Sequence, residues 1–197
     1  MNITHNSMKM KNISQLTRPW NSRGITLVES LITLAIAAVT LSLAAPGYSS
    51  LLHKNDMRAA SGLLHTTLNV ARIESVKRRR AIRVCPSADS ASCRNDGDWS
   101  DGWLVFEDLN ANGAPDAAEI IQLVDSLEHG VAIEVSTSID QYLQFEPTGI
   151  AGGNAGLAGE FRICHEDSNA YSLVLGVSAA GQVSFKQSIQ VDCSEAR

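Results

Sequence analysis

Arg23-Gly24-Ile25-Thr26-Leu27-Val28-Glu29 opens the stretch of sequence that decides the fold, and an apolar run follows it as far as Ala45. Between residues 25 and 45 the only charged side chain is Glu29, and most of the others are Leu, Ile, Val and Ala. A helix of this length reaches about 30 Å, which is enough to cross the hydrocarbon core of a membrane. Placing a carboxylate within an apolar span costs free energy. The presence of Glu29 therefore indicates a functional role and a partner that neutralises its charge.

The position of Glu29 indicates what that partner would be. A cut after Gly24 would leave a free α-amino group one helical turn away from the carboxylate. An α-amino group of the same chain or of a neighbouring chain would then be the natural counter-charge.

The glycine, the Thr26-Leu27-Val28-Glu29 motif and the apolar run resemble the N-terminal signature of type IV prepilins and type II secretion pseudopilins. In that family a prepilin peptidase cuts after the glycine and methylates the new N-terminus, and the glutamate guides docking into a helical filament. The resemblance implies cleavage between Gly24 and Ile25, N-methylation of Ile25 and a filament-assembly role for Glu29. Ile25 departs from the family, because most members carry phenylalanine at that position.

The same stretch has a second interpretation, an ordinary secretory signal peptide cleaved near Ser42-Leu43-Ala44. The apolar run is long for such a peptide and contains Glu29, and a helical pattern follows it directly. We therefore favour the prepilin interpretation over the signal peptide and over an unprocessed single-pass anchor.

The charge of the chain is unevenly distributed. The formal net charge of the 197 residues is −5, yet the basic side chains Lys9, Lys11, Arg18 and Arg23 precede the apolar run with no acidic one among them. Without these, 12 of the 16 basic side chains remain against all 21 acidic ones, so the rest of the chain is acidic. A basic flank before an apolar span predicts a cytoplasmic N-terminus and an exported C-terminal domain. The acidic balance is not that of a nucleic-acid binder.

Four segments follow from these patterns: a leader peptide at 1–24, a transmembrane and filament-core helix at 25–48, an amphipathic helix at 49–80 and a β-rich domain at 81–197. Pro46 lacks a backbone N–H and is predicted to kink the helix where it leaves the membrane. In the amphipathic segment, apolar residues at three- and four-residue steps predict a face that packs on a sheet. They are Met57, Ala60, Leu64, Leu68 and Ala71, with Leu63, Val70 and Ile73 widening the stripe.

A run of basic side chains ends this helix, and one more follows it: Lys77, Arg78, Arg79, Arg80 and Arg83. Cations near a helix C-terminus are favoured by the backbone dipole, which explains part of the run. Four in succession exceed what capping requires. We therefore treat these five as a candidate contact for an anion or DNA, although the acidic domain opposes DNA binding.

Beyond Arg80 the chain changes to short β-like runs separated by Gly, Asn, Asp and Ser, which predict antiparallel sheets. Strands are expected at 81–85, 103–107, 120–124, 131–135, 142–145, 161–164, 171–177 and 182–185. The glycine-rich residues 149–159 are expected to form a loop.

Several of these runs resemble the GspH/FimT group of minor pseudopilins. The matching motifs are Trp99-Ser100-Asp101-Gly102-Trp103, Asp108-x-Asn110-x-Asn112-Gly113-x-x-Asp116-x-x-Glu119, Phe145-x-Pro147-x-Gly149, Phe161-Arg162-Ile163-Cys164 and Ser178-Ala179-Ala180-Gly181. The resemblance implies an α+β, type IV pilin-like fold, in which a long N-terminal helix packs on an antiparallel two-sheet β domain. Independently of the family, we expect Trp99 and Trp103 to be core or loop-pinning residues.

The cysteines suit an exported domain, where disulfides persist. Cys85, Cys93, Cys164 and Cys193 allow three pairings, of which we favour Cys85 with Cys93 and Cys164 with Cys193. None of the close Cys-x-x-Cys spacings of a zinc site is present.

Asp108, Asn110, Asn112, Asp116 and Glu119 match the calcium-loop pattern D-x-[DN]-x-[DN]-G-x5-E. Strands and not helices flank the pattern, so the preferred interpretation is a polar hairpin that turns at Asn112-Gly113. No cofactor is expected, and calcium is kept as the alternative. No serine lies in a nucleophile elbow and the histidines stand apart, so we do not expect an enzyme.

The sequence therefore predicts a minor pseudopilin with one helix in the bacterial inner membrane and its C-terminal domain in the periplasm. Its expected partners are a prepilin peptidase and other pilins in the fibre of a type IV pilus or a type II secretion system. The alternative function is a pilus-associated DNA receptor. Some FimT-like proteins bind DNA through a basic motif after the last glycine. Here Gly181 is followed by Gln182-Val183-Ser184-Phe185-Lys186, without paired arginines.

Overall fold

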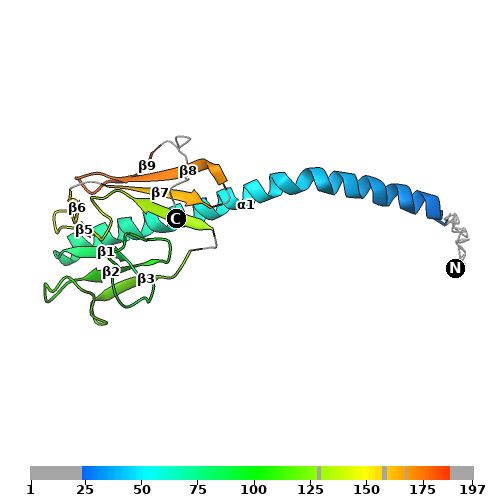
Figure 1. Cartoon of the computed structure of the whole chain (residues 1–197). Coiled ribbons are helices and arrows are strands. Elements are labelled where there is room, and N and C mark those ends of the chain that lie inside the picture. The colour runs from blue at the N-terminus through cyan, green and yellow to red at the C-terminus, as the bar shows by residue number, and fades with distance from the viewer. Residues whose placement is uncertain (1–23, 128–129, 157–158, 167, 187–197) are drawn as a thin grey trace, which may run out of the picture. The chain divides into compact units, whose positions relative to one another are not determined.

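The structure, a computed structural model, describes residues 24–127, 130–156, 159–166 and 168–186, with the side chains of 44–46 and 168–170 left out (Figure 1). The chain divides into two compact units, Met1–Leu43 and Ala44–Arg197. The helix α1, Leu27–Arg78, begins in the first unit and ends in the second. Helical structure continues through Pro46, so the two predicted segments belong to one helix, and the kink at Pro46 stays a prediction.

Both ends of α1 are capped by local interactions. At the start, the backbone N–H of Glu29 donates to Thr26 Oγ1 over 3.2 Å, which is an N-cap bond. At the end, Arg79 adopts the left-handed conformation with φ 58° and the N–H of Arg80 donates to the carbonyl of Ser75 over 3.2 Å. This is the bond of a Schellman motif, which usually places glycine where Arg79 stands.

The β domain contains two antiparallel sheets (Figure 1). The first has the order β3-β2-β1-β5-β6, and its strands are β1 (Ile82–Pro86), β2 (Trp103–Glu107), β3 (Ile120–Val124), β5 (Leu143–Phe145) and β6 (Ala151–Gly153). The second has the order β4-β7-β8-β9, and its strands are β4 (Val131–Val135), β7 (Gly159–His165), β8 (Ser168–Val177) and β9 (Val183–Lys186). The two-sheet fold predicted from the sequence is confirmed.

The second half of α1 packs on both sheets. Its residues Met57, Leu64, Leu68 and Ala71 are fully buried, in one cluster with residues such as Val84 and Phe145 of the first sheet and Phe161 and Leu175 of the second. Burial of Leu64 and of Leu68 stabilises the fold by about 2 kcal/mol each. The core face predicted from helical periodicity is therefore confirmed.

Two expectations from the sequence are corrected by the structure. Leu63 and Ile73 do not widen the buried stripe, since they are 41% and 62% exposed. In addition, the glycine-rich residues 149–159 contain the strand β6, which pairs with β5 through Leu143↔Gly153 and Phe145↔Ala151. Backbone pairing forms this strand, because its two glycines provide no side-chain pattern.

The predicted core role of the tryptophans is confirmed. Trp99 and Trp103 are 0% and 1% exposed. Trp99 meets Phe161 edge to face at 5.0 Å and donates from Nε1 to the carbonyl of Asp140 over 3.2 Å. Trp99 thereby ties the loop before β2 to the second sheet.

Candidate functional site

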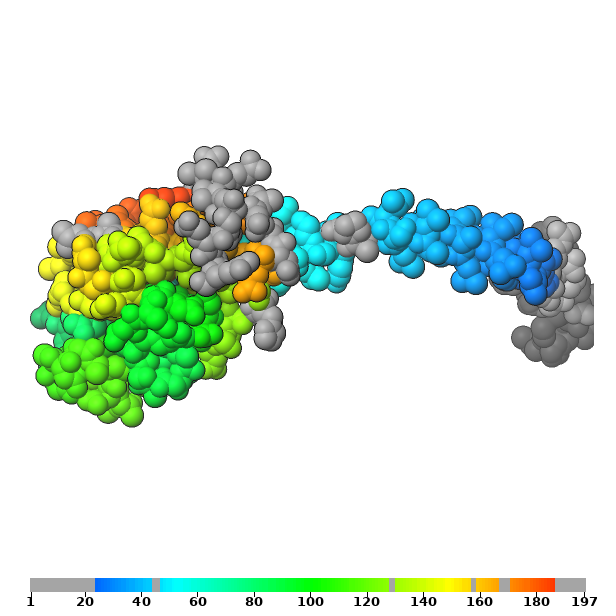
Figure 2. Space-filling view, viewed as in Figure 1, coloured from blue at the N-terminus to red at the C-terminus, as the bar shows by residue number. Residues whose placement is uncertain are grey.

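The first candidate site is the start of α1. The large apolar side chains of residues 25–43 are exposed, Ile25 to 76%, and Figure 2 draws this segment in blue. Among the described residues, α1 is the one helix long and apolar enough to span a membrane.

Glu29 lies in the first turn of this exposed helix. Its backbone is used by the Thr26 cap, and its carboxylate makes no ion pair with any described residue. A negative charge in the first turn is favoured by the helix dipole. Gly24 and Ile25 precede the helix in an exposed, non-helical stretch.

The basic run at the other end of α1 is largely neutralised by carboxylates. Lys77 and Arg78 pair with Glu74 over 3.0 and 2.6 Å, and Arg78 and Arg80 pair with Glu107 of β2 over 3.1 and 3.3 Å. The hydrogen bonds from Arg78 and then Lys77 hold the pKa of Glu74 below its usual value. Those to Glu74 and then Glu107 raise the pKa of Arg78.

Arg79 is the member of the run without an ion pair among the described residues. The structure does not assemble the five predicted DNA-contact residues into one free basic patch, because Glu74 and Glu107 compensate three of them. The sequence alone could not indicate the part played by Glu107, since this residue comes from a strand distant along the chain.

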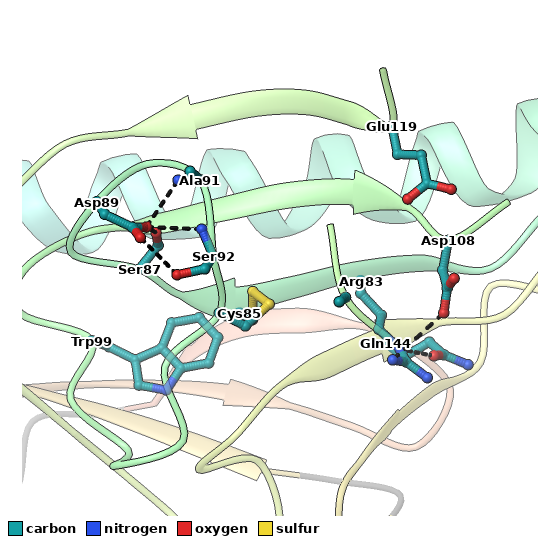
Figure 3. Close-up of a disulfide and its surroundings, with 12 residues drawn as sticks. Arg83, Cys85, Ser87, Asp89, Ala91, Ser92, Trp99, Asp108, Glu119 and Gln144 are labelled. Atoms are coloured by element: carbon teal, nitrogen blue, oxygen red, sulfur yellow. Dashed lines mark hydrogen bonds and ion pairs between the residues drawn. A yellow bond between two sulfur atoms is a disulfide. The ribbon is translucent and has the colours of Figure 1, made fainter. Parts of the chain in front are cut away.

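Arg83 is held by partners of the first sheet, toward Gln144 and Asp108 (Figure 3). Its Nε donates to Gln144 Oε1 over 2.6 Å, its guanidinium lies 4.6 Å from the ring centre of Tyr142, and Nη1 is 3.7 Å from Asp108. Arg83 therefore joins β1, β5 and the β2–β3 loop, which is a structural role.

The predicted hairpin between β2 and β3 is confirmed, and its carboxylates are occupied by the loop itself. Glu119, which is 6% exposed, accepts the backbone N–H of Leu109 over 2.8 Å and that of Asp116 over 3.1 Å. Asp108 accepts the N–H groups of Asn112 and Gly113 over 3.0 and 2.9 Å. Figure 3 shows Asp108 turned toward Arg83.

The same loop bears on the calcium alternative. The side chain of Asn110 donates to Asp116 over 2.7 Å, so these two predicted ligands also bind each other. Within the described ranges, no three His, Cys, Asp or Glu side chains gather as they would around a metal. The loop turns through positive φ at Ala111 (57°) and Gly113 (79°), a longer turn than the predicted Asn112-Gly113 pair. This geometry supports the polar hairpin.

The Cys85–Cys93 disulfide is confirmed, and Asp89 organises the loop that it closes (Figure 3). The carboxylate of Asp89 accepts the hydroxyl and the N–H of Ser92 and the N–H of Ala91, and these bonds lower its pKa. Cys164 is also in a disulfide, and its predicted partner, Cys193, lies outside the described residues.

A cluster that sequence reasoning did not assign holds α1 to two loops of the β domain. Arg72 donates from Nε to the carbonyl of Gly149 over 3.3 Å and from Nη2 to that of Ala180 over 3.1 Å. Ser75 donates to the carbonyl of Glu146 over 3.1 Å. The signal was present in the Phe145-x-Pro147-x-Gly149 and Ser178-Ala179-Ala180-Gly181 motifs, whose glycines have positive φ of 79° and 73°.

Comparisons with known proteins agree with this architecture. The sequence model of the family described as type II transport protein GspH matches residues 60–181, more than half of the chain. The crystal structure of the type IV minor pilin FimU from Pseudomonas aeruginosa is similar with a TM-score of 0.55 and 23% identity, covering 70% of this chain and 96% of that chain.

A second crystal form of FimU gives a TM-score of 0.52 at 23% identity and covers 68% of this chain and 98% of that one. The minor pseudopilin EpsH from the type 2 secretion system of Vibrio cholerae gives 0.49 at 9% identity, with coverages of 66% and 96%. No curated protein sequence matches at a significant level. The likeness to FimU establishes the type IV pilin-like fold.

Proposed function

Because the chain belongs to the GspH family of minor pseudopilins, we propose that it is cut after Gly24, anchored by α1 in the bacterial inner membrane and assembled into a pilus-like fibre. The β domain then lies in the periplasm, where the Cys85–Cys93 disulfide is stable. Members of this family assemble with other pilins or pseudopilins, and these are the proposed neighbours of residues 25–45.

The observation that carries the proposal is the exposed apolar helix with the single charge of Glu29 in its first turn. An exposed apolar surface of this length is stable only in lipid or against similar helices. A carboxylate in that setting needs a counter-charge. The α-amino group that cleavage creates on Ile25 of a neighbouring subunit supplies one.

The chemistry that we assign to the chain is docking, not catalysis. Ion pairing between Glu29 and the amino group of a neighbour sets the axial position of one subunit on the next, since a buried charge pair is stable only in register. Packing of residues 25–45 against neighbouring helices then holds the fibre together.

The fibre is that of a type IV pilus or of a type II secretion system. A gene deletion in the host cell would distinguish the two. Deletion of the gene should abolish surface pili and twitching in the first case, and release of secreted enzymes in the second. Complementation with the full chain should restore the lost process. Loss of neither process, with the chain absent from sheared fibres, would contradict the proposed function.

A further inference from the structure

A groove of about 520 Å³ lies between the last turns of α1 and the loop that joins β5 to β6. It is lined by Arg72, Ile73, Val76, Lys77, Thr148 and Gly149. Ile73 and Val76 are 62% and 50% exposed, although both are branched apolar side chains of α1. The assembly role proposed for residues 25–45 does not explain why these two side chains face the solvent.

One side chain of the groove, Arg72, carries a positive charge that no carboxylate of the described residues compensates. Arg72 spends its hydrogen bonds on the carbonyl groups of Gly149 and Ala180, so its charge has no carboxylate partner among the described residues. Lys77 lies at the rim with a side chain that is 71% exposed, and its partner is Glu74. Hydrogen bonds to carbonyl groups fix the Arg72 guanidinium in place without neutralising it.

The shape of the groove is set before any partner arrives. Gly149 is held by Arg72 and packed against Gly181, and Ser75 holds the same loop through Glu146. A preformed apolar floor with a fixed cation beside it binds at low entropic cost. The complementary ligand is a peptide that offers an apolar side chain and, next to it, a carboxylate.

We propose that this groove binds an acidic, apolar segment of a different pilin-like subunit. Its apolar side chain packs on Ile73 and Val76, and its carboxylate faces Arg72 and Lys77. The inference rests on the proposed function, because a minor subunit of a fibre has other subunits as its neighbours. It adds a second contact, on the β domain, to the one made by residues 25–45.

The test is site-specific cross-linking of the full chain in cells that assemble the fibre. A photoreactive amino acid replaces Thr148, which is exposed and lines the groove. A matched probe replaces Leu109, an exposed apolar residue of the β2–β3 loop. The expected adduct at position 148 contains a peptide of another pilin-like subunit with a carboxylate beside an apolar residue, and the probe at position 109 should not capture it.

Two substitutions in the groove then test the two halves of the ligand. Ile73→Asp and Lys77→Glu should each lower the yield of the 148 adduct about tenfold, while Leu109→Asp leaves it unchanged. All three side chains are exposed, so the fold should survive, which equal protease resistance in the membrane fraction verifies.

Three results would overturn the groove assignment: a 148 adduct confined to this chain or a second copy of it, an adduct with DNA, or equal yields from Ile73→Asp and the unchanged chain. The proposed function is read separately from sheared fibres. If the chain is present in fibres but the 148 adduct does not form, only the groove assignment is contradicted. If the chain is absent from fibres, the proposed function is contradicted, even where the adduct forms.

Discussion

The backbone of Gly181 lies so close to Gly149 that a Cβ built on Gly181 would stand 1.9 Å from the Gly149 carbonyl oxygen. That oxygen also accepts the Nε–H of Arg72. The contact brings the β8–β9 turn, the β5–β6 loop and α1 to one point. The Phe145-x-Pro147-x-Gly149 and Ser178-Ala179-Ala180-Gly181 motifs are distant in the sequence. Their final glycines meet at this contact, which explains why both motifs end in glycine.

Gly181→Ala should destabilise the β domain by about 2 kcal/mol or more, because the new methyl group meets a fixed carbonyl and the residue has a φ of +73°. Urea unfolding of the purified protein measures the change. Gly62→Ala is the matched control. No atom lies within 4 Å of its new methyl group and Gly62 is inside α1, so stability should rise by about 0.5–1 kcal/mol. Equal changes in stability from Gly181→Ala and Gly62→Ala would contradict the close contact between Gly181 and the Gly149 carbonyl.

Arg79→Gly should stabilise the protein by about 1 kcal/mol, because Arg79 occupies the left-handed position of the Schellman motif, which glycine adopts without strain. Thermal unfolding monitored by circular dichroism gives the change. Arg78→Gly, one residue earlier, removes an ion pair with Glu74 of the same helix and one with Glu107 of β2, so it should destabilise the protein. If Arg79→Gly instead lowers stability, the Arg79 side chain makes a stabilising contact that outweighs the strain of its backbone.

Asp89 should make the disulfide-closed loop sensitive to acid. Its bonds with Ser92 and Ala91 place its folded-state pKa below the ordinary value of 3.8, so its contribution is complete above that value and is lost as the pH falls below it. Asp89→Asn should therefore destabilise the protein at about pH 6 and have a smaller effect at about pH 2.5. Unfolding curves at both pH values test this. A loss of stability that is larger at about pH 2.5 than at about pH 6 would contradict the expected role of Asp89.

The mature chain should begin at Ile25 with a methylated α-amino group. The glycine before the apolar helix and the exposed stretch of residues 24–26 motivate this expectation. Intact-mass measurement and N-terminal peptide mapping of protein extracted from membranes provide the test. A chain that begins near Ala45 or Pro46 would instead be the product of an ordinary signal peptidase.

Periodicity and local chemistry predicted most of the helices and strands, whereas the two-sheet arrangement was implied by the resemblance to the GspH/FimT group. Steps of three and four residues from Met57 to Ala71 marked the buried face of α1, and strand-like runs located eight of the nine strands in the described part of the chain. Leu63 and Ile73 fitted the same period and are nevertheless exposed. Periodicity identifies an apolar face of the helix, but it does not show which residues of that face are covered by the β domain.

The candidate sites show why residue type and spacing are not enough. Arg78 and Arg80 of the basic run looked free because their partner Glu107 is brought to them by β2. Likewise, the oxygens of Asp108 and Glu119 fit a calcium loop by type, but backbone N–H groups use them. Both outcomes depend on donors and carboxylates that only the folded chain places. Glu29 lies in the first turn of α1, and its role in filament assembly stays a prediction.

The most direct test of the central claim, fibre assembly through Glu29, is the amount of the Glu29→Ala chain in sheared fibres relative to the membrane. Removal of a charge from an apolar helix should leave insertion intact, so the membrane fraction should hold normal amounts of protein. The counter-charge for the neighbour's amino group is lost, and the account predicts that the variant is absent from the fibres. Leu109→Asp, remote from the helix, should be incorporated normally. Recovery of Glu29→Ala in fibres at the level of the unchanged chain would contradict the account.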